Sequence, residues 1–179
     1  MNKYKKITLF LVKFFGTYFL LFVIYATYLQ KSQIKNGGFQ CASLTRNVAT
    51  QTQNLLTTFG YHVSTIQHEA EMSVKILVGE QYVARVIEGC NSASIIILFI
   101  SFVIAFSGPK GATLVFVIFG SAIIYVINIF RIAFLTMMLY KFPNEQVLLH
   151  NLIFPAIIYG TTFLLWVFWV QKFSHYKND

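Results

Sequence analysis

The sequence predicts a mainly α-helical polytopic membrane protein, a single membrane domain with about four transmembrane helices and a small α+β cap between the first and the second. Of its 179 residues, 56% are hydrophobic and only 11% are charged, whereas soluble domains carry about 25% charged residues. The apolar residues gather in four long runs, and one longer polar region lies between the first two runs. Apolar surface on this scale requires lipid as its solvent.

The four runs are interpreted as membrane spans in chain order. The first follows a basic start, but its length and the lack of a small-x-small cleavage site favour a retained helix over a signal peptide. The second ends at a turn around Gly108 and Pro109. Trp166 and Trp169, near the end of the fourth, are interpreted as interfacial anchors. The predicted spans are residues 7–29, 91–107, 112–140 and 148–170.

The polar region, residues 30–90, is predicted to fold as the cap. Apolar residues at helical spacing predict a helix over residues 44–59, which Gly60 would end. Alternating residues and a Gly79-Glu80 hairpin turn predict strands after it. These strands are expected at residues 61–66, 73–78 and 81–87.

Lysines indicate the orientation of the spans. With four spans, the short basic segments fall on one side, which the positive-inside rule makes the cytoplasm, so that the cap is extracytoplasmic. These lysines are Lys3, Lys5, Lys6, Lys110, Lys172 and Lys177. The net charge of +8 is attributed to anionic membrane lipid rather than nucleic acid, because the sequence has no basic stripe and no nucleic-acid-binding motif.

Three chemically useful side chains stand at one depth in this topology. Cys90 opens the second span, and His150 opens the fourth on the same side. Arg131 lies roughly 27 Å along the third span, at ~1.5 Å per residue, which brings it to that level. Arginine within a span costs ~2.5–3.5 kcal/mol on insertion scales and is a functional candidate by default. Each residue alone has a structural interpretation, such as packing or snorkelling, and the coincidence of all three favours an active site.

The three side chains fit nucleophilic catalysis on a carbonyl. The Cys90 thiolate would be the nucleophile, and His150 would be the general base toward the thiol or the acid toward a leaving amine. The Arg131 guanidinium would stabilise the tetrahedral oxyanion. Asn128 lies three residues before Arg131, on the same helical face, and would orient it or add a donor.

Residues next to Cys90 have supporting interpretations. Asn91, Ser92 or Ser94 would cap the second span and place Cys90 at the positive end of a helix, which favours a thiolate. Glu88 is interpreted as a solvated carboxylate, with steering of a basic acceptor as the alternative.

No cofactor and no metal site is predicted, because neither cysteine lies in a CxxC motif or a Cys/His cluster. A disulfide between Cys41 and Cys90 stays open at this point, since two cysteines alone do not establish one. The sequence contains no HExxH, GxSxG or P-loop motif.

Three stretches carry a resemblance to a known family. They are VARVIEGCNSASIIILFISFVIAF, GSAIIYVINIFRIAFL and LLHNLIFPAIIYGTTFLLWV, with cysteine opening one span, Asn-x-x-Arg in the next and histidine opening another. In this order they resemble the exosortase/archaeosortase family, closest to its compact exosortase F branch. The chain has Cys-Asn-Ser at residues 90–92, where typical members have Cys-Ser-Gly.

The resemblance implies a membrane-embedded cysteine transpeptidase of the bacterial inner membrane. Such enzymes act on the C-terminal sorting-signal helix of exported proteins at the outer face and transfer the new carboxyl end to a surface acceptor. Cys90 would be the nucleophile, Arg131 the stabiliser of oxyanion or substrate, and His150 the acid/base. The alternative interpretation is a non-catalytic membrane assembly or scaffold subunit in which Cys90 and Arg131 serve packing.

Overall fold

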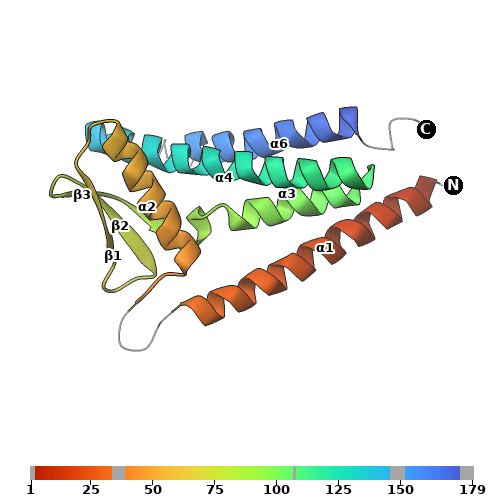
Figure 1. Ribbon diagram of the computed structural model, residues 1–179, viewed down its shortest axis with the longest axis horizontal. Helices are drawn as coiled ribbons and strands as arrows, with labels where there is room; N and C mark the ends of the chain where they lie inside the picture. The colour runs from red at the N-terminus through yellow and green to blue at the C-terminus, as the bar shows by residue number, and fades with distance from the viewer. Residues whose placement is uncertain (1–2, 34–38, 107, 146–151, 174–179) are drawn as a thin grey trace.

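The computed structural model describes residues 3–33, 39–106, 108–145 and 152–173, in which long helices run beside one another and a small sheet lies at one end (Figure 1). The long helices are α1 (Lys3–Ser32), α3 (Ala93–Ala105), α4 (Lys110–Lys141) and α6 (Phe154–Lys172). Helix α3 is central and packs against the other three. The start of α1 and the end of α6 lie at the end opposite the sheet. We call the end with the sheet the sheet end.

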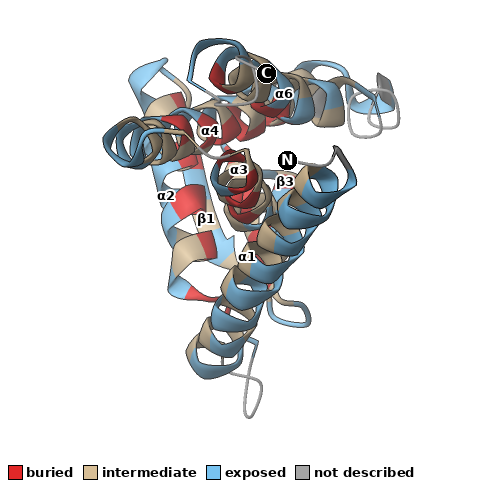
Figure 2. Ribbon diagram, turned by 90° about the vertical axis from the view of Figure 1, so that its right-hand side faces the viewer, coloured by how far each residue is buried: buried red, intermediate tan, exposed pale blue. Residues whose placement is uncertain are grey.

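Two helices in the described part of the chain are long and apolar enough to cross a membrane, Tyr4–Ser32 and Lys110–Lys141. Their outward side chains are apolar: Leu20 in α1 is 63% exposed and Phe119 in α4 is 66% exposed. Figure 2 shows α1 without any buried residue along its described length. Side chains of this kind require lipid around them. The structure therefore supports a membrane protein, while the count of four spans stays a prediction, because α3 has only 13 residues.

The helix boundaries lie close to those predicted from hydropathy. Helix α1 extends beyond the predicted 7–29 at both ends, and α4 exceeds the predicted 112–140 by a few residues. Helix α3 is shorter than the predicted 91–107. The predicted fourth span begins outside the described residues, and the described part of it forms α6.

An α+β segment joins α1 to α3, and its position as an extracytoplasmic cap stays a prediction. It contains α2 (Ser43–Thr58) and the strands β1 (Val63–Gln67), β2 (Ser73–Val78) and β3 (Gln81–Ile87). The strands form an antiparallel sheet in the order β1-β2-β3. Val78 pairs with Gln81 across a two-residue turn, where Gly79 adopts a φ of 63° that residues with a Cβ rarely take.

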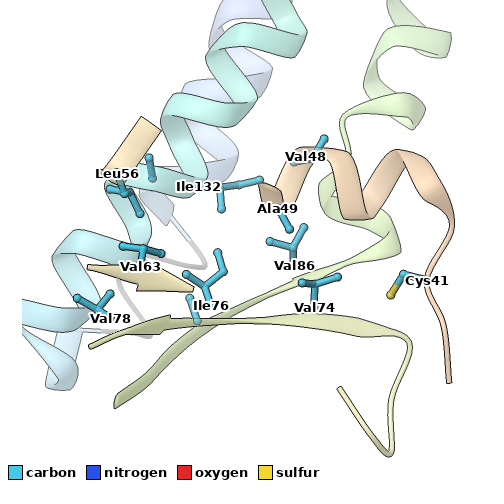
Figure 3. Packing of buried hydrophobic residues seen from close by; sticks show 12 residues of the cluster. Cys41, Val48, Ala49, Leu56, Val63, Val74, Ile76, Val78, Val86 and Ile132 are labelled. Carbon is cyan, nitrogen blue, oxygen red and sulfur yellow. The ribbon is translucent and has the colours of Figure 1, made fainter. Parts of the chain in front are cut away.

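The sheet packs one face against α2 and part of α4 (Figure 3). Val74, Ile76 and Val78 alternate along β2 and all point into this core, as expected for a strand with one buried face. Ile132 and Ala133 bring α4 into the same cluster. This sheet-end core consists of Cys41, Val48, Ala49, Leu56, Val63, Val74, Ile76, Val78, Ala84, Val86, Ile132 and Ala133.

A second cluster, the bundle core, holds α3, α4 and α6 together. It consists of Phe99, Val103, Ile124, Ile158 and Trp169. Trp169 is fully buried, and its ring stacks on Phe116 at 4.9 Å between centroids. The prediction that Trp169 anchors the chain at an interface is therefore wrong. Gly120 lets α4 approach α3 closely, since a Cβ there would lie 2.3 Å from the Phe99 ring.

Candidate active site

Cys90 lies at the sheet end, in the short link between β3 and α3. Strand β3 ends at Ile87, and Glu88–Cys90 form a single 3₁₀ turn, η1. Helix α3 begins at Ala93, so Cys90 precedes the helix rather than standing in its first turn. The Cys90 side chain is partly exposed and packs against the edge of the sheet-end core. The site is thus built where the sheet meets the helical bundle.

The start of α3 is capped by Asn91 rather than by a serine hydroxyl. The Asn91 Oδ1 atom accepts a hydrogen bond from the Ala93 N–H at 3.1 Å, which satisfies one of the free donors at the helix start. Ser92 is the N-cap residue by position but makes no capping bond; its hydroxyl donates to the Asn91 carbonyl at 2.6 Å. Ser92 has a φ of 61°, and no other described non-glycine residue has a positive φ.

Arg131 and Cys90 come together in the structure. The guanidinium of Arg131 lies close enough to the Cys90 side chain for the two to interact electrostatically. Tyr159 of α6 lies within electrostatic range of the same guanidinium. A fixed cation beside a thiol can stabilise a thiolate, or a negative charge that develops on an atom bonded to the sulfur.

Asn128 reaches the same link from α4. Its amide nitrogen donates to the Cys90 carbonyl at 2.7 Å, and the residue is only 1% exposed. The amide therefore holds the Cys90 backbone, and the predicted role of Asn128 in orienting Arg131 or adding a donor stays a prediction. Asn128 and Arg131 stand three residues apart on α4, on one helical face, and together they contact the backbone and the side chain of Cys90.

The second cysteine has a different environment. Cys41 is fully buried, and both cysteines are free thiols, so the structure contains no Cys41–Cys90 disulfide. The side-chain amide of Gln67 donates to the Cys41 sulfur at 3.7 Å. Burial raises the pKa of the Cys41 thiol. Cys41 is therefore a buried core residue, whereas Cys90 is partly exposed and lies near a cation.

His150, the third predicted catalytic residue, lies outside the described residues. Its role stays a prediction from the sequence.

Glu88 is the residue whose role sequence reasoning missed. It was interpreted as solvated, but its carboxylate accepts the Ala42 N–H at 2.7 Å and the Thr45 hydroxyl at 2.5 Å. A signal for this was present in α2: the helix has alanine at its N-cap and no acidic residue in its first turn. A helix start without a cap of its own requires a partner from elsewhere in the chain.

The fold and the site together define a membrane protein with a partly exposed cysteine beside an arginine. The sequence model of the transmembrane exosortase family matches residues 8–170. The chain belongs to the transmembrane exosortase family, a family of membrane cysteine transpeptidases. No curated protein and no solved structure matches the chain.

Proposed function

We propose that the protein is a cysteine transpeptidase that cleaves the C-terminal sorting signal of exported proteins and transfers the acyl group to an acceptor at the cell surface. The observation that supports this most directly is the Arg131 guanidinium beside the Cys90 side chain. Two separate elements, η1 and α4, supply these residues. Family membership supplies the reaction class.

In the proposed reaction, the Cys90 thiolate attacks the carbonyl carbon of the scissile peptide bond. Arg131 stabilises the oxyanion of the tetrahedral intermediate. His150 gives a proton to the leaving amine, the C–N bond breaks, and the substrate remains as a thioester on Cys90. An acceptor nucleophile then attacks the thioester carbonyl and loses its proton to His150, and Cys90 leaves as a thiolate.

The proposed membrane position of the site would suit this substrate. We propose that the sheet end lies on the extracytoplasmic side of the bacterial inner membrane, since the basic residues Lys110 and Lys172 lie at the opposite end of their helices. A substrate held by its own C-terminal transmembrane helix would present the residues just outside that helix at the depth of Cys90. The partly exposed position of Cys90, where the helices meet the sheet, is consistent with this approach.

Trapping the thioester tests the proposal. The protein would be co-expressed with an exported protein that carries a C-terminal transmembrane segment and a basic tail, quenched in acid and digested. Mass spectrometry is expected to find a substrate acyl group on Cys90 that hydroxylamine removes. If Cys90→Ala still supported full processing, the scaffold alternative would replace the enzyme.

A further inference from the structure

The Glu88 carboxylate, two residues before Cys90, is fixed to the start of α2. It accepts the Ala42 N–H and the hydroxyl of Thr45, a residue with no exposed surface. In a capping box, a glutamate at the third position of the same helix would accept the N-cap N–H. Here Thr45 occupies that third position, and Glu88 supplies the carboxylate from a distant segment. The contact also places a negative charge at the positive end of the α2 dipole.

Asn91, the residue after Cys90, is fixed on the other side. Its side-chain amide donates to the Tyr25 hydroxyl of α1 at 2.8 Å and to the Thr45 hydroxyl at 3.1 Å. The residue is 1% exposed, and both amide hydrogens have partners. The Tyr25 hydroxyl also donates to the Glu88 carbonyl at 3.5 Å. Asn91 therefore ties the start of α3 to α1 and α2 at once.

Thr45 joins these two anchors. Its hydroxyl donates to Glu88 and accepts from Asn91, so one buried oxygen bridges the residues on both sides of the Cys90 link. The Cys90 carbonyl is held by Asn128 from α4. The backbone on either side of the nucleophile is thus held from three helices.

The link requires such support because its own structure is weak. A 3₁₀ turn of three residues has poor hydrogen-bond geometry, and η1 lies between an extended Ile87 and a left-handed Ser92. Displacement of a reacting group by about 1 Å can cost on the order of 10²-fold in rate. The position of the Cys90 thiol relative to Arg131 therefore depends on the side chains that hold the link.

We propose that Glu88 and Thr45 are positioning residues for the nucleophile: they lock η1 so that the Cys90 thiol stays against Arg131. This inference rests on the proposed function. It adds that the α2 helix supports the active site through Thr45. Neither residue needs to contact the substrate for this role.

A simple charge effect and a positioning effect have opposite signs. Loss of a nearby carboxylate charge alone would favour the thiolate and speed alkylation of Cys90. Loss of positioning would separate the thiol from Arg131 and slow alkylation. The rate of Cys90 alkylation therefore distinguishes the two roles, and its measurement requires no protein substrate.

The experiment uses the full-length protein in lipid nanodiscs, with Cys41→Ala so that Cys90 is the sole thiol. The second-order rate of alkylation by iodoacetamide is measured from neutral to alkaline pH, and the unfolding temperature is measured in parallel. Thr45→Val and Glu88→Gln are each expected to slow alkylation at neutral pH by about tenfold, because the thiol would no longer be held beside the Arg131 guanidinium. Thr45→Ser, which keeps the hydroxyl, is expected to restore the rate.

Thr52→Val is the matched control. Thr52 is equally buried on α2, but its hydroxyl donates only within the helix, to the Val48 carbonyl at 2.8 Å. Its alkylation rate should equal that of the parent protein. Alkylation of both Thr45→Val and Glu88→Gln at or above the control rate would overturn the proposal.

The Arg131→Gln variant distinguishes a failure of this inference from a failure of the proposed function. If Arg131→Gln slows alkylation and Thr45→Val does not, the pairing of thiol and arginine stands and only the positioning role is lost. If Arg131→Gln leaves the rate unchanged, the pairing that supports the proposed function is itself contradicted.

Discussion

The two ends of the molecule are held together by different interactions. At the sheet end, buried Thr45, Asn91 and Asn128 hydrogen-bond residues from other elements and surround the Cys90 link. In the bundle core, the packing of apolar and aromatic side chains dominates: the Trp169 ring stacks on Phe116 at 4.9 Å between centroids. Hydrogen bonds fix direction and distance, whereas apolar packing is non-directional. We therefore expect changes at the sheet end to alter chemistry and changes in the bundle core to alter stability.

Substitution of the two cysteines is expected to give the largest difference in substrate processing. Cys90→Ala is expected to reduce processing of a co-expressed substrate by about three orders of magnitude or more, because it removes the nucleophile. Cys41→Ala should leave processing unchanged, since Cys41 is buried in the sheet-end core. The measurement is the fraction of processed substrate on an immunoblot over time. Equal loss in both variants would mean that the assay reports folding rather than chemistry.

Arg131 should have the next largest effect. Arg131→Gln is expected to lower processing on the order of 10²-fold, the typical loss when one oxyanion donor is removed. Arg85→Gln is the control, because Arg85 lies on β3 as an exposed ion-pair partner of Glu71 and exposed pairs contribute little. If both variants process substrate at the same rate, the proposed role of Arg131 is wrong.

A substitution at the contact between Gly120 and Phe99 is expected to lower the stability of the protein without changing the chemistry of Cys90. Gly120→Ala places a Cβ 2.3 Å from a ring that has no exposed surface in which to move, and overpacking of this kind costs about 1–3 kcal/mol. Gly111→Ala, on the same helix, meets nothing within 4 Å. Thermal unfolding in detergent should show a lower midpoint for Gly120→Ala alone, with the alkylation rate of Cys90 unchanged below that midpoint. An unchanged midpoint would show that the ring adjusts freely.

Much of the fold follows from local patterns that the sequence displays directly. The alternation of Val74, Ile76 and Val78 and the turn at Gly79 predicted two strands, and the predicted bounds agree with those observed for β2 and β3. Hydropathy located α1 and α4 to within a few residues. Both signals depend only on near neighbours in the chain, which is why they could be interpreted without the tertiary structure.

The site was only partly predictable because its contacts join distant segments. Arg131 and Cys90 were placed at one depth from span lengths alone, and the structure brings them together. The bonds from Glu88 to α2 connect residues more than 40 positions apart, and no local pattern encodes them. Trp169 was misplaced for the same reason, since its partners Phe116 and Gly108 come from other parts of the chain.

Substitution of Ser92, which has a left-handed backbone, is expected to have the smallest effect. It tests how rigid the Cys90 link is. The left-handed conformation costs a residue with a Cβ roughly 1–2 kcal/mol. Part of the stability gained by a change to glycine is offset because glycine has more conformational freedom in the unfolded chain. Ser92→Gly should therefore stabilise the protein by about 0.5–1 kcal/mol, even though the bond from Ser92 to the Asn91 carbonyl is lost. The typical Cys-Ser-Gly pattern has glycine at this position, which suits the observed φ of 61°.

Ser94→Gly is the matched control for this substitution. Ser94 is exposed in the first turn of α3, where glycine lowers helix stability by up to about 1 kcal/mol, so the same change should act there with the opposite sign. The unfolding midpoints of the two variants should move apart, upward for Ser92→Gly and downward for Ser94→Gly. If both midpoints fall, the Ser92 hydroxyl contributes more than the backbone strain removes, and the link is held by its own side chain as well as by Glu88, Thr45 and Asn128.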